Sequence, residues 1–386
     1  MSILVPSQTL PNVWKNKMDA SSVFYNPVME FNRDISILAL ESYGGTTNRK
    51  VHVLDAMTGC GVRGVRYAAE VDGVADVLLN DFQKVATDLA IQNVTRNGVS
   101  DRARVVCMDA NLVLASHAAP DNRFDVIDID PFGSPAPFLD SAIRATSNGA
   151  LVALTATDMA PLCGVRPNAA FRKYGGRPLR TEYCKEIGIR LLIASLATTA
   201  ARHDLGIEIK LAHSTDHYVR VYATVRRGGT RGNRTLGRLG YIAHCFHCSN
   251  RKLSDRLAII ESVCKVCGHR YAFAGPLWLG NLHDKEFCKQ MLNLIETKKL
   301  GKKNRAKRFL ERILGEIDCL PTYYMIDRLC DKYQIPLPKP KDVVGKLQKN
   351  GYLASLTHFH GNGVRTDAGS KVLMEVLSEL SEKSGA

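Results

Sequence analysis

Five apolar runs alternate with helical patterns between residues 51 and 228. The runs that predict buried strands cover 51–55, 76–81, 104–108, 124–129 and 149–155. Helical periodicity predicts helices over 29–43, 62–70, 84–97 and 181–203. Strands that are apolar on both faces and alternate with helices are typical of a parallel sheet covered on both sides. The chain therefore predicts an α/β fold with a doubly wound, mostly parallel sheet. Two further apolar runs, 207–212 and 218–225, fit an antiparallel hairpin at its edge.

The pattern changes at residues 226–238, where glycine and arginine replace apolar residues. We interpret this stretch as a linker between a domain over 1–230 and a second, α+β domain over 231–386. The second domain begins with a cysteine-rich module at about 240–280. At about 318–386 the helical segments 322–333 and 341–350 and a hairpin-like segment, 352–365, follow in the order of a winged helix. A chain of 386 residues is also longer than one typical hydrophobic core.

Composition and charge narrow the class of protein. With 45% hydrophobic and 23% charged residues, the chain is typical of a folded globular protein. Because no apolar run reaches the roughly 20 residues that span a bilayer, and residues 1–8 lack a signal-peptide pattern, we expect a cytoplasmic protein with no membrane partner. The net charge of +14 is the usual sign of nucleic-acid binding, although it could simply keep the protein in solution.

Four of the eleven cysteines form two closely spaced pairs. Cys245 and Cys248 are separated by two residues, as are Cys264 and Cys267, with fifteen residues between the pairs. This spacing predicts a four-thiolate zinc ribbon, because two such turns let four sulfurs converge as a tetrahedron. The protein would fill all four coordination positions, so the Zn²⁺ is expected to be structural rather than catalytic.

A glycine-rich loop follows the first predicted strand. Gly59, Gly61 and Gly64 satisfy the dinucleotide fingerprint G-x-G-x-x-G, and Asp81 lies about 20 residues on. That pattern alone would favour an NAD oxidoreductase. However, Asp55 lies four residues before Gly59, where a carboxylate would repel a pyrophosphate and attract a cationic amino group.

The D-x-x-x-G-x-G pattern resembles the first motif of class I S-adenosylmethionine methyltransferases. The resemblance implies a Rossmann-like fold in which the loop of Gly59 and Gly61 wraps the methionine end of S-adenosyl-L-methionine. It also implies that Asp81 binds the ribose and that Asp109 and Ala110 lie by the adenine. These carboxylates fall at predicted strand ends, where open α/β sheets bind ligands. The alternative is that each aspartate only caps the helix that follows it.

The sequence DIDPFG at residues 128–133 is the most informative feature of the chain. At a predicted strand end, Asp130 would accept hydrogen bonds from an N–H edge, Pro131 would stiffen the backbone, and Phe132 would offer a stacking face. This combination fits recognition of a flat ring that carries an amine. Asp128 has the same strand parity but lies deeper, so Asp130 is the preferred catalytic residue.

Longer stretches resemble the tRNA (guanine-26-N2)-dimethyltransferase family of archaea and eukaryotes. They are YNPVMEFNRD at 25–34, DAMTGCGVRG at 55–64, DIDPFGSP at 128–135 and TEY at 181–183, together with the cysteine module. One departure is a single proline after Asp130, where amine-methylating enzymes usually have two. The resemblance implies methyl transfer from S-adenosyl-L-methionine to the exocyclic N2 of guanine 26 in tRNA.

The same resemblance implies a role for particular side chains. Arg33 and Arg63 would join the aspartates in binding the cofactor, Asp130 would be the acid/base, and Phe24 and Phe132 would sandwich the guanine. Without the resemblance, Arg33 would be interpreted as a solvated helix residue and Phe24 as a core aromatic.

Two basic segments are candidates for tRNA contact. The stretch 298–308 holds seven basic residues in eleven, and the linker carries Arg226, Arg227, Arg231, Arg234 and Arg238. A solvated helix face is the alternative for the first. Other functions compatible with the motifs are a base-amine methyltransferase acting on rRNA or DNA, and an inactive nucleic-acid-binding protein.

Overall fold

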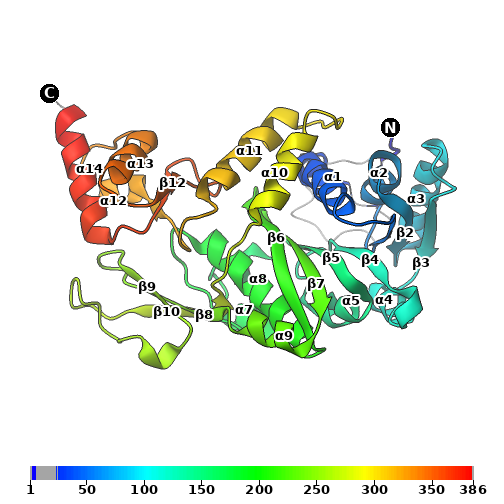
Figure 1. Cartoon of the computed structure of the whole chain (residues 1–386), viewed down its shortest axis with the longest axis horizontal. Helices are drawn as coiled ribbons and strands as arrows, with labels where there is room; N and C mark the ends of the chain where they lie inside the picture. Colours follow the sequence, from blue (N-terminus) through cyan, green and yellow to red (C-terminus); the bar gives the residue numbers. More distant parts are fainter. Residues whose placement is uncertain (1, 6–22, 24, 385–386) are drawn as a thin grey trace.

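A seven-stranded sheet forms the centre of the molecule in the computed structural model, which describes residues 2–5, 23 and 25–384 (Figure 1). The strands are β1 (Val51–Asp55), β2 (Val74–Asp81), β3 (Ala103–Cys107), β4 (Phe124–Ile129), β5 (Thr146–Ala156), β6 (Leu205–Thr215) and β7 (Tyr218–Arg227). Their order is β3-β2-β1-β4-β5-β7-β6, and β1 to β5 pair in parallel. Since β7 is antiparallel to β5 and β6, the predicted mostly parallel sheet with an edge hairpin is confirmed.

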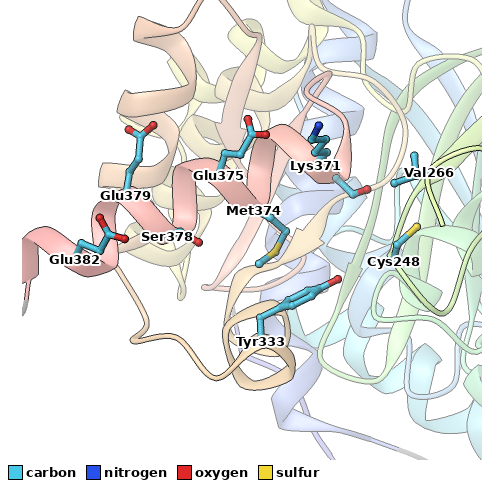
Figure 2. A pocket seen from close by; sticks show the side chains of 10 residues that line it. Cys248, Val266, Tyr333, Lys371, Met374, Glu375, Ser378, Glu379 and Glu382 are labelled. Atoms are coloured by element: carbon cyan, nitrogen blue, oxygen red, sulfur yellow. The ribbon is translucent and has the colours of Figure 1, made fainter.

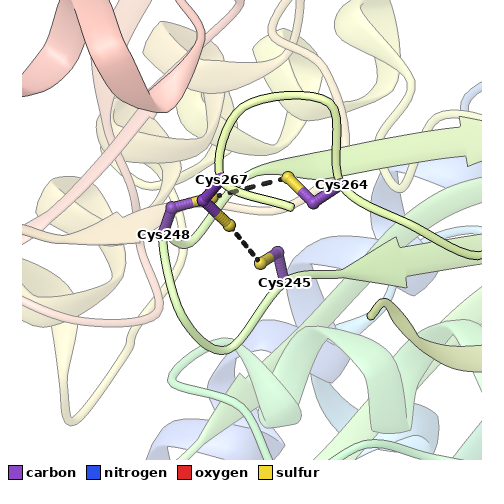
Figure 3. Close-up of side chains that lie close together, drawn as sticks. All are labelled: Cys245, Cys248, Cys264 and Cys267. Carbon is purple, nitrogen blue, oxygen red and sulfur yellow. Dashed lines mark hydrogen bonds between the residues drawn. The ribbon is translucent and has the colours of Figure 1, made fainter. Parts of the chain in front are cut away.

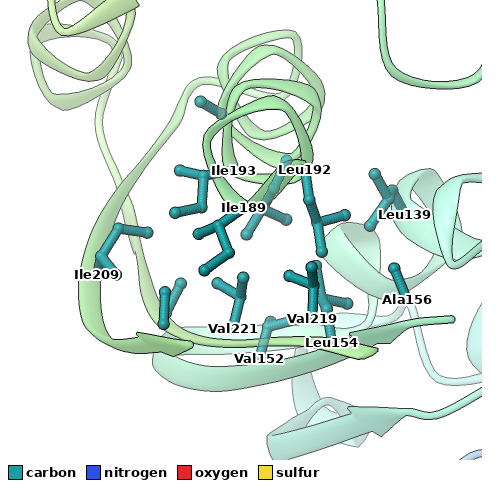
Figure 4. Close-up of a cluster of buried hydrophobic side chains, with 14 of the residues drawn as sticks. Leu139, Val152, Leu154, Ala156, Ile189, Leu192, Ile193, Ile209, Val219 and Val221 are labelled. Atoms are coloured by element: carbon teal, nitrogen blue, oxygen red, sulfur yellow. The ribbon is translucent and has the colours of Figure 1, made fainter. Parts of the chain in front are cut away.

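Helices cover both faces of this sheet because its strands are apolar on both faces. Along β5, Val152 and Leu154 belong to one buried cluster, whereas Leu151 and Ala153 belong to the other. The first cluster is covered by helices that include α5 (Leu139–Arg144) and α8 (Cys184–Ala201) (Figure 4). The second is covered by α1 (Glu30–Gly44), α2 (Val62–Glu70), α10 (Lys285–Leu294) and α11 (Lys303–Glu316). Helix α3 (Lys84–Arg96) flanks β2 and β3.

Helix α8 is the main support of the first face. Ile189, Leu192 and Ile193 are fully buried and point toward the strands in Figure 4. Truncating a leucine in such a site typically costs about 2–5 kcal/mol. Short helices α4 (Ala110–Ser116), α6 (Met159–Leu162) and α7 (Pro167–Tyr174) complete the connections on the carboxyl side of the strands.

The segment 226–238 is not the extended linker that its composition suggested. It holds the end of β7 and helix α9 (Gly229–Leu236). The Thr235 hydroxyl accepts a hydrogen bond from the Ile207 amide at 3.0 Å, which docks α9 on β6. At Gly206 an added Cβ would lie 2.6 Å from the carbonyl oxygen of Arg231, so the absence of a side chain allows this close approach.

Two small sheets follow in the C-terminal region. One contains β8 (Leu239–His244), β9 (Arg251–Ser254) and β10 (Ala272–Trp278) and carries the cysteine module. The other contains β11 (Tyr324–Met325), β12 (Ala354–Leu356) and β13 (Gly363–Thr366), packed with α12 (Ile326–Tyr333), α13 (Pro340–Lys349) and α14 (Ser370–Ser384) around its own core. The predicted helix at 322–333 begins only at Ile326, because Tyr324 and Met325 pair with β13 as strand β11.

A buried ion network joins this end to the sheet domain. Arg365 on β13 pairs with Glu186 on α8 at 2.9 Å and with Glu316 on α11. Burial opposes ionisation of Glu186, but the guanidiniums of Arg365 and Arg190 hold its pKa at about 2. Within the described residues, no helix combines the length and apolar character needed to cross a membrane.

Candidate active site

The glycine loop after β1 has the backbone shape that only glycine adopts freely. Gly59 and Gly61 have φ values of +54° and +81°, in the left-handed region. An added Cβ at Gly64 would lie 2.6 Å from the Leu79 side chain, so this glycine lets α2 pack closely on β2. The loop and the start of α2 thereby lie at the carboxyl end of the sheet, beside the ends of β2 and β4.

Asp55 holds this loop from behind. Its side chain is buried, and Oδ2 accepts hydrogen bonds from the Thr58 hydroxyl at 2.7 Å and from the Gly64 amide at 2.9 Å. Burial and the neighbouring Asp128 carboxylate raise the pKa of Asp55 to about 7. These two hydrogen bonds of Asp55 keep the two ends of the loop together.

Asp81 and Asp109 lie at adjacent strand ends, as expected. Asp81 accepts from the Gly59 amide at 2.9 Å, which connects β2 to the glycine loop. Asp109 is the N-cap of α4, with Oδ1 accepting from the amides of Asn111 and Leu112, and Ala110 is the first residue of that helix. Asp109 therefore does cap the helix that follows it. The second oxygen of Asp109, Oδ2, makes no hydrogen bond to the described residues.

The two aspartates of the DIDPFG sequence have different surroundings. Asp128 is completely buried and forms a two-pronged pair with Arg220, at 2.8 Å to Nη1 and 2.7 Å to Nη2. It also accepts from the Tyr67 hydroxyl at 2.6 Å. Although burial disfavours its charge, Arg220 and Arg63 keep the pKa of Asp128 below its usual value. Asp128 is therefore a structural anion, with both of its oxygens hydrogen-bonded inside the protein.

Asp130 comes directly after β4, at the carboxyl edge of the sheet. Its side chain is 21% exposed, and Oδ2 pairs with Arg63 Nη2. Oδ1 makes no hydrogen bond to any described residue. Arg63 is held in turn by the Ser36 hydroxyl at 2.7 Å, and its Nε lies 3.8 Å from Asp128. The arginine therefore fixes one Asp130 oxygen, while the other is not bound by Arg63.

Phe132 is presented to solvent next to Asp130. It is 64% exposed. The loop behind it is fixed because Gly133, with φ of +88°, exchanges two 2.8 Å hydrogen bonds with Thr157 after β5. Its predicted partner, Phe24, lies outside the described residues. Arg33 is tied to the neighbouring segment, because its guanidinium lies over the Tyr25 ring at 5.1 Å and donates to the Asn26 carbonyl oxygen at 3.1 Å.

Three buried partners of this site were missed by the sequence reasoning. They are Ser36, Tyr67 and Arg220, which connect α1, α2 and β7 to Asp128 and Arg63. A signal for one of them was present: Arg220 is a lone charge in an otherwise apolar run. A charge in a strand with two buried faces requires a buried counter-ion.

The four cysteines converge as their spacing predicted (Figure 3). Their sulfurs all lie within 4.8 Å of one another, with Cys245 and Cys267 3.4 Å apart and Cys248 and Cys264 3.6 Å apart. Zn–S bonds of about 2.3 Å in a tetrahedron place sulfurs roughly 3.8 Å apart. The donor set and its spacing fit a zinc ion.

Most basic residues of the stretch 298–308 form ion pairs within the protein. Five of its seven basic residues form ion pairs: Lys298 with Glu41 and Asp72, Lys302 with Glu30, Lys303 and Lys307 with Glu296, and Arg305 with Asp216. Several of these carboxylates belong to the sheet domain, so the stretch docks α11 on that domain. The structure favours this packing role over a free phosphate-binding surface.

Comparisons with known proteins agree with the resemblance carried by the motifs. The family model "N2,N2-dimethylguanosine tRNA methyltransferase" matches residues 5–378. A protein of Methanobrevibacter smithii named tRNA (guanine(26)-N(2))-dimethyltransferase is 40% identical over 94% of this chain and 92% of its own length. A Halobacterium salinarum protein of the same name is 39% identical over 91% of this chain and 92% of its own length. The structure of Trm1 from Pyrococcus horikoshii with S-adenosyl-L-methionine is 34% identical, covers 97% of both chains and superposes with a TM-score of 0.84.

Proposed function

The chain belongs to the N2,N2-dimethylguanosine tRNA methyltransferase family, and from this premise we propose that it methylates the N2 of guanine 26 in tRNA with Asp130 as the acid/base. It is an S-adenosyl-L-methionine-dependent methyltransferase. One observation supports Asp130 as the acid/base. Arg63 pairs with only one of its two oxygens, and the exposed ring of Phe132 lies beside it.

The chemistry needs a base because guanine N2 is a poor nucleophile, with its lone pair delocalised into the ring. Asp130 Oδ1 accepts one N2–H, which localises the lone pair and takes up the proton as the N–C bond forms. S-adenosyl-L-methionine supplies the electrophilic methyl group. The proton then passes from Asp130 to solvent, and the remaining N–H allows a second round with the same carboxylate.

Phe132 supplies a face on which the guanine stacks, and Phe24 would cover the opposite face. The target base is stacked in folded tRNA and must leave its stack to reach Asp130, at a cost of a few kcal/mol. Aromatic stacking of about 1–3 kcal/mol per base offsets part of that cost.

The cofactor is assigned to the loop and strand ends described above. Gly59 and Gly61 would surround its methionine end, with Asp55 holding the loop. Asp81 would bind the ribose hydroxyls, and the strand end at Asp109 and Ala110 would lie by the adenine. Arg33 and Arg63 are proposed to complete the binding site.

The proposal also includes a zinc site and a role for the C-terminal region. Cys245, Cys248, Cys264 and Cys267 would hold a structural Zn²⁺, and residues 231–386 would contribute to tRNA binding. Because family members with this activity act on tRNA, we propose that this protein works in the cytoplasm.

The test is methyl transfer from labelled S-adenosyl-L-methionine to bulk unmodified tRNA, ribosomal RNA and DNA in parallel. Labelling of tRNA alone is expected. Labelling of ribosomal RNA or DNA in its place would support a different base-amine methyltransferase. Binding of nucleic acid with no labelling would indicate an inactive binding protein.

A further inference from the structure

An exposed basic surface, with one of its five cations paired to an acid, lies beside the proposed catalytic loop. Residues 159–181 contain five cations and no carboxylate. We call these five side chains, all exposed, the α7 surface: Arg166, Arg172, Lys173, Arg177 and Arg180. They lie on α7 or on the segments directly before and after it.

The α7 surface is joined to the Asp130 loop by short contacts. Thr157 exchanges hydrogen bonds with Gly133, and the next residue, Asp158, accepts from Lys173 Nζ at 2.9 Å and from the Tyr174 hydroxyl at 2.6 Å. The chain that carries these cations is therefore anchored on the same loop that presents Phe132. We therefore expect the phosphates that flank a base held at Asp130 to lie near this surface.

Most of the charge on this surface is available to a ligand. Arg166, Arg172 and Arg180 make no ion pair with any described residue. Arg177 lies over the Phe171 ring at 5.1 Å and keeps its charge exposed, whereas Lys173 is paired with Asp158. Each exposed, unpaired arginine can bind a phosphate without first breaking an internal ion pair.

The backbone of the segment that follows α7 is also fixed by hydrogen bonds to the cysteine module. The amide and carbonyl groups of Arg177 pair at 3.0 and 2.9 Å with those of Gly275, which lies within β10. At Gly176 an added Cβ would lie 2.4 Å from the Pro276 carbonyl oxygen. The α7 surface is thus a rigid bridge between the catalytic loop and the cysteine module.

Other candidate surfaces are less suited to phosphate. The groove of about 590 Å³ beside α14 is lined by Glu375, Glu379 and Glu382 against Lys371, so it would repel a polyanion (Figure 2). In the stretch 298–308, most of the basic side chains already pair with carboxylates of the protein. The Arg227 amide donates to Asn148 near the amino end of β5. Asn148 is eight positions before Ala156 at the carboxyl end of the strand, a distance of about 26 Å.

We propose that the α7 surface binds the phosphate backbone of tRNA immediately around the target nucleotide. This inference rests on the proposed function, because it takes tRNA as the substrate and Asp130 as the point where the base is held. It is a different surface from both basic segments that the sequence alone suggested.

The test compares two triple variants of the full-length protein. Arg166→Gln/Arg172→Gln/Arg180→Gln removes three cations from the α7 surface, and Arg226→Gln/Arg227→Gln/Arg234→Gln removes three exposed cations at the opposite edge as a matched control. The affinity for unmodified tRNA is measured between about 50 and 200 mM salt. Affinity for S-adenosyl-L-methionine and the melting temperature are measured in parallel.

We expect the α7 variant to bind tRNA about ten- to a hundredfold more weakly at 100 mM salt, with a slope of log K against log[salt] reduced by about 2–3. The control variant should retain both values. Arg→Lys substitutions at the same three positions should restore most of the affinity, because the charge is kept. Unchanged affinity and slope in the glutamine variant would overturn the inference, as would an equal loss in the control or in the lysine variant.

Failure of this inference is distinguishable from failure of the proposed function. If the wild-type protein labels tRNA and the α7 variant binds like wild type, only the surface assignment is lost. If the wild-type protein labels no tRNA at all, the proposed function fails first.

Discussion

Asp128 lies on β4 and Asp130 just after it. Removing the charge of Asp130 should mainly lower the rate, whereas removing that of Asp128 should mainly lower the stability. In Asp130→Asn, the amide cannot take up the proton from guanine N2. General base catalysis contributes about 10²–10⁴-fold, so the rate of methyl transfer should fall by that factor, or about 3–5 kcal/mol. The cost in folding should be small, about 1 kcal/mol, because Arg63 keeps its contacts with Ser36 at 2.7 Å and Asp128 at 3.8 Å.

Asp128→Asn should instead destabilise the fold. The change leaves Arg220, which is fully buried, without its counter-ion. Removing one partner of a buried pair typically costs about 3–5 kcal/mol. For a domain of this size each kcal/mol lowers the melting temperature by about 2–4 °C, so a fall of about 6–20 °C is expected.

The assay is single-turnover methylation of tRNA at saturating cofactor, with the melting temperature and cofactor affinity measured on the same preparations. Asp130→Asn should keep its cofactor affinity and lose its rate. Near-normal turnover in Asp130→Asn would refute the assignment of the base. So would a stable, well-folded Asp128→Asn variant that has lost only its rate, since this would identify the buried aspartate as the catalytic one.

Three further perturbations test other parts of the account. Phe132→Ala should weaken stacking of the target base by about 1–3 kcal/mol and be seen as a reduced kcat/KM for tRNA with unchanged cofactor affinity, whereas Phe132→Tyr should retain most activity. Removal of zinc by chelation, or Cys264→Ala, should unfold the cysteine module; metal analysis that finds no zinc in protein purified without chelator would contradict the site. The folded-state pKa of Glu186 is depressed to about 2, so its stabilising contribution is present above about pH 4.5 and is lost as the pH falls toward 2. Acid denaturation of Arg365→Met should show a smaller component of this kind, because Arg190 still pairs with Glu186 at 2.8 Å, and an unchanged acid transition would argue against the Glu186–Arg365 pair.

The strands and the ends of the strands were predictable because they depend on local patterns. Continuous apolar runs located β1 to β7, and a carboxylate at or just after the end of each of β1, β2 and β3 located the site at the carboxyl edge of the sheet. The cysteine spacing was equally local, since two short turns bring each pair together.

Features that depend on contacts between distant segments were not predictable. Helix α9 was missed because its glycines and arginines resemble a linker, and it forms by docking on β6. The role of Lys298 and Arg305 was open until Glu41 and Asp216 were placed beside them. Likewise, Arg63 and Asp130 are 67 positions apart in the sequence, so no local motif could indicate that they form a pair.

The most direct test of the central claim is to map methylated nucleosides by mass spectrometry after incubating the protein with unmodified tRNA and S-adenosyl-L-methionine. The account predicts N2-methylguanosine and N2,N2-dimethylguanosine at position 26, and their loss when that guanine is replaced by adenine. Methylation confined to another atom or another position, or no methylated guanosine at all, would contradict it.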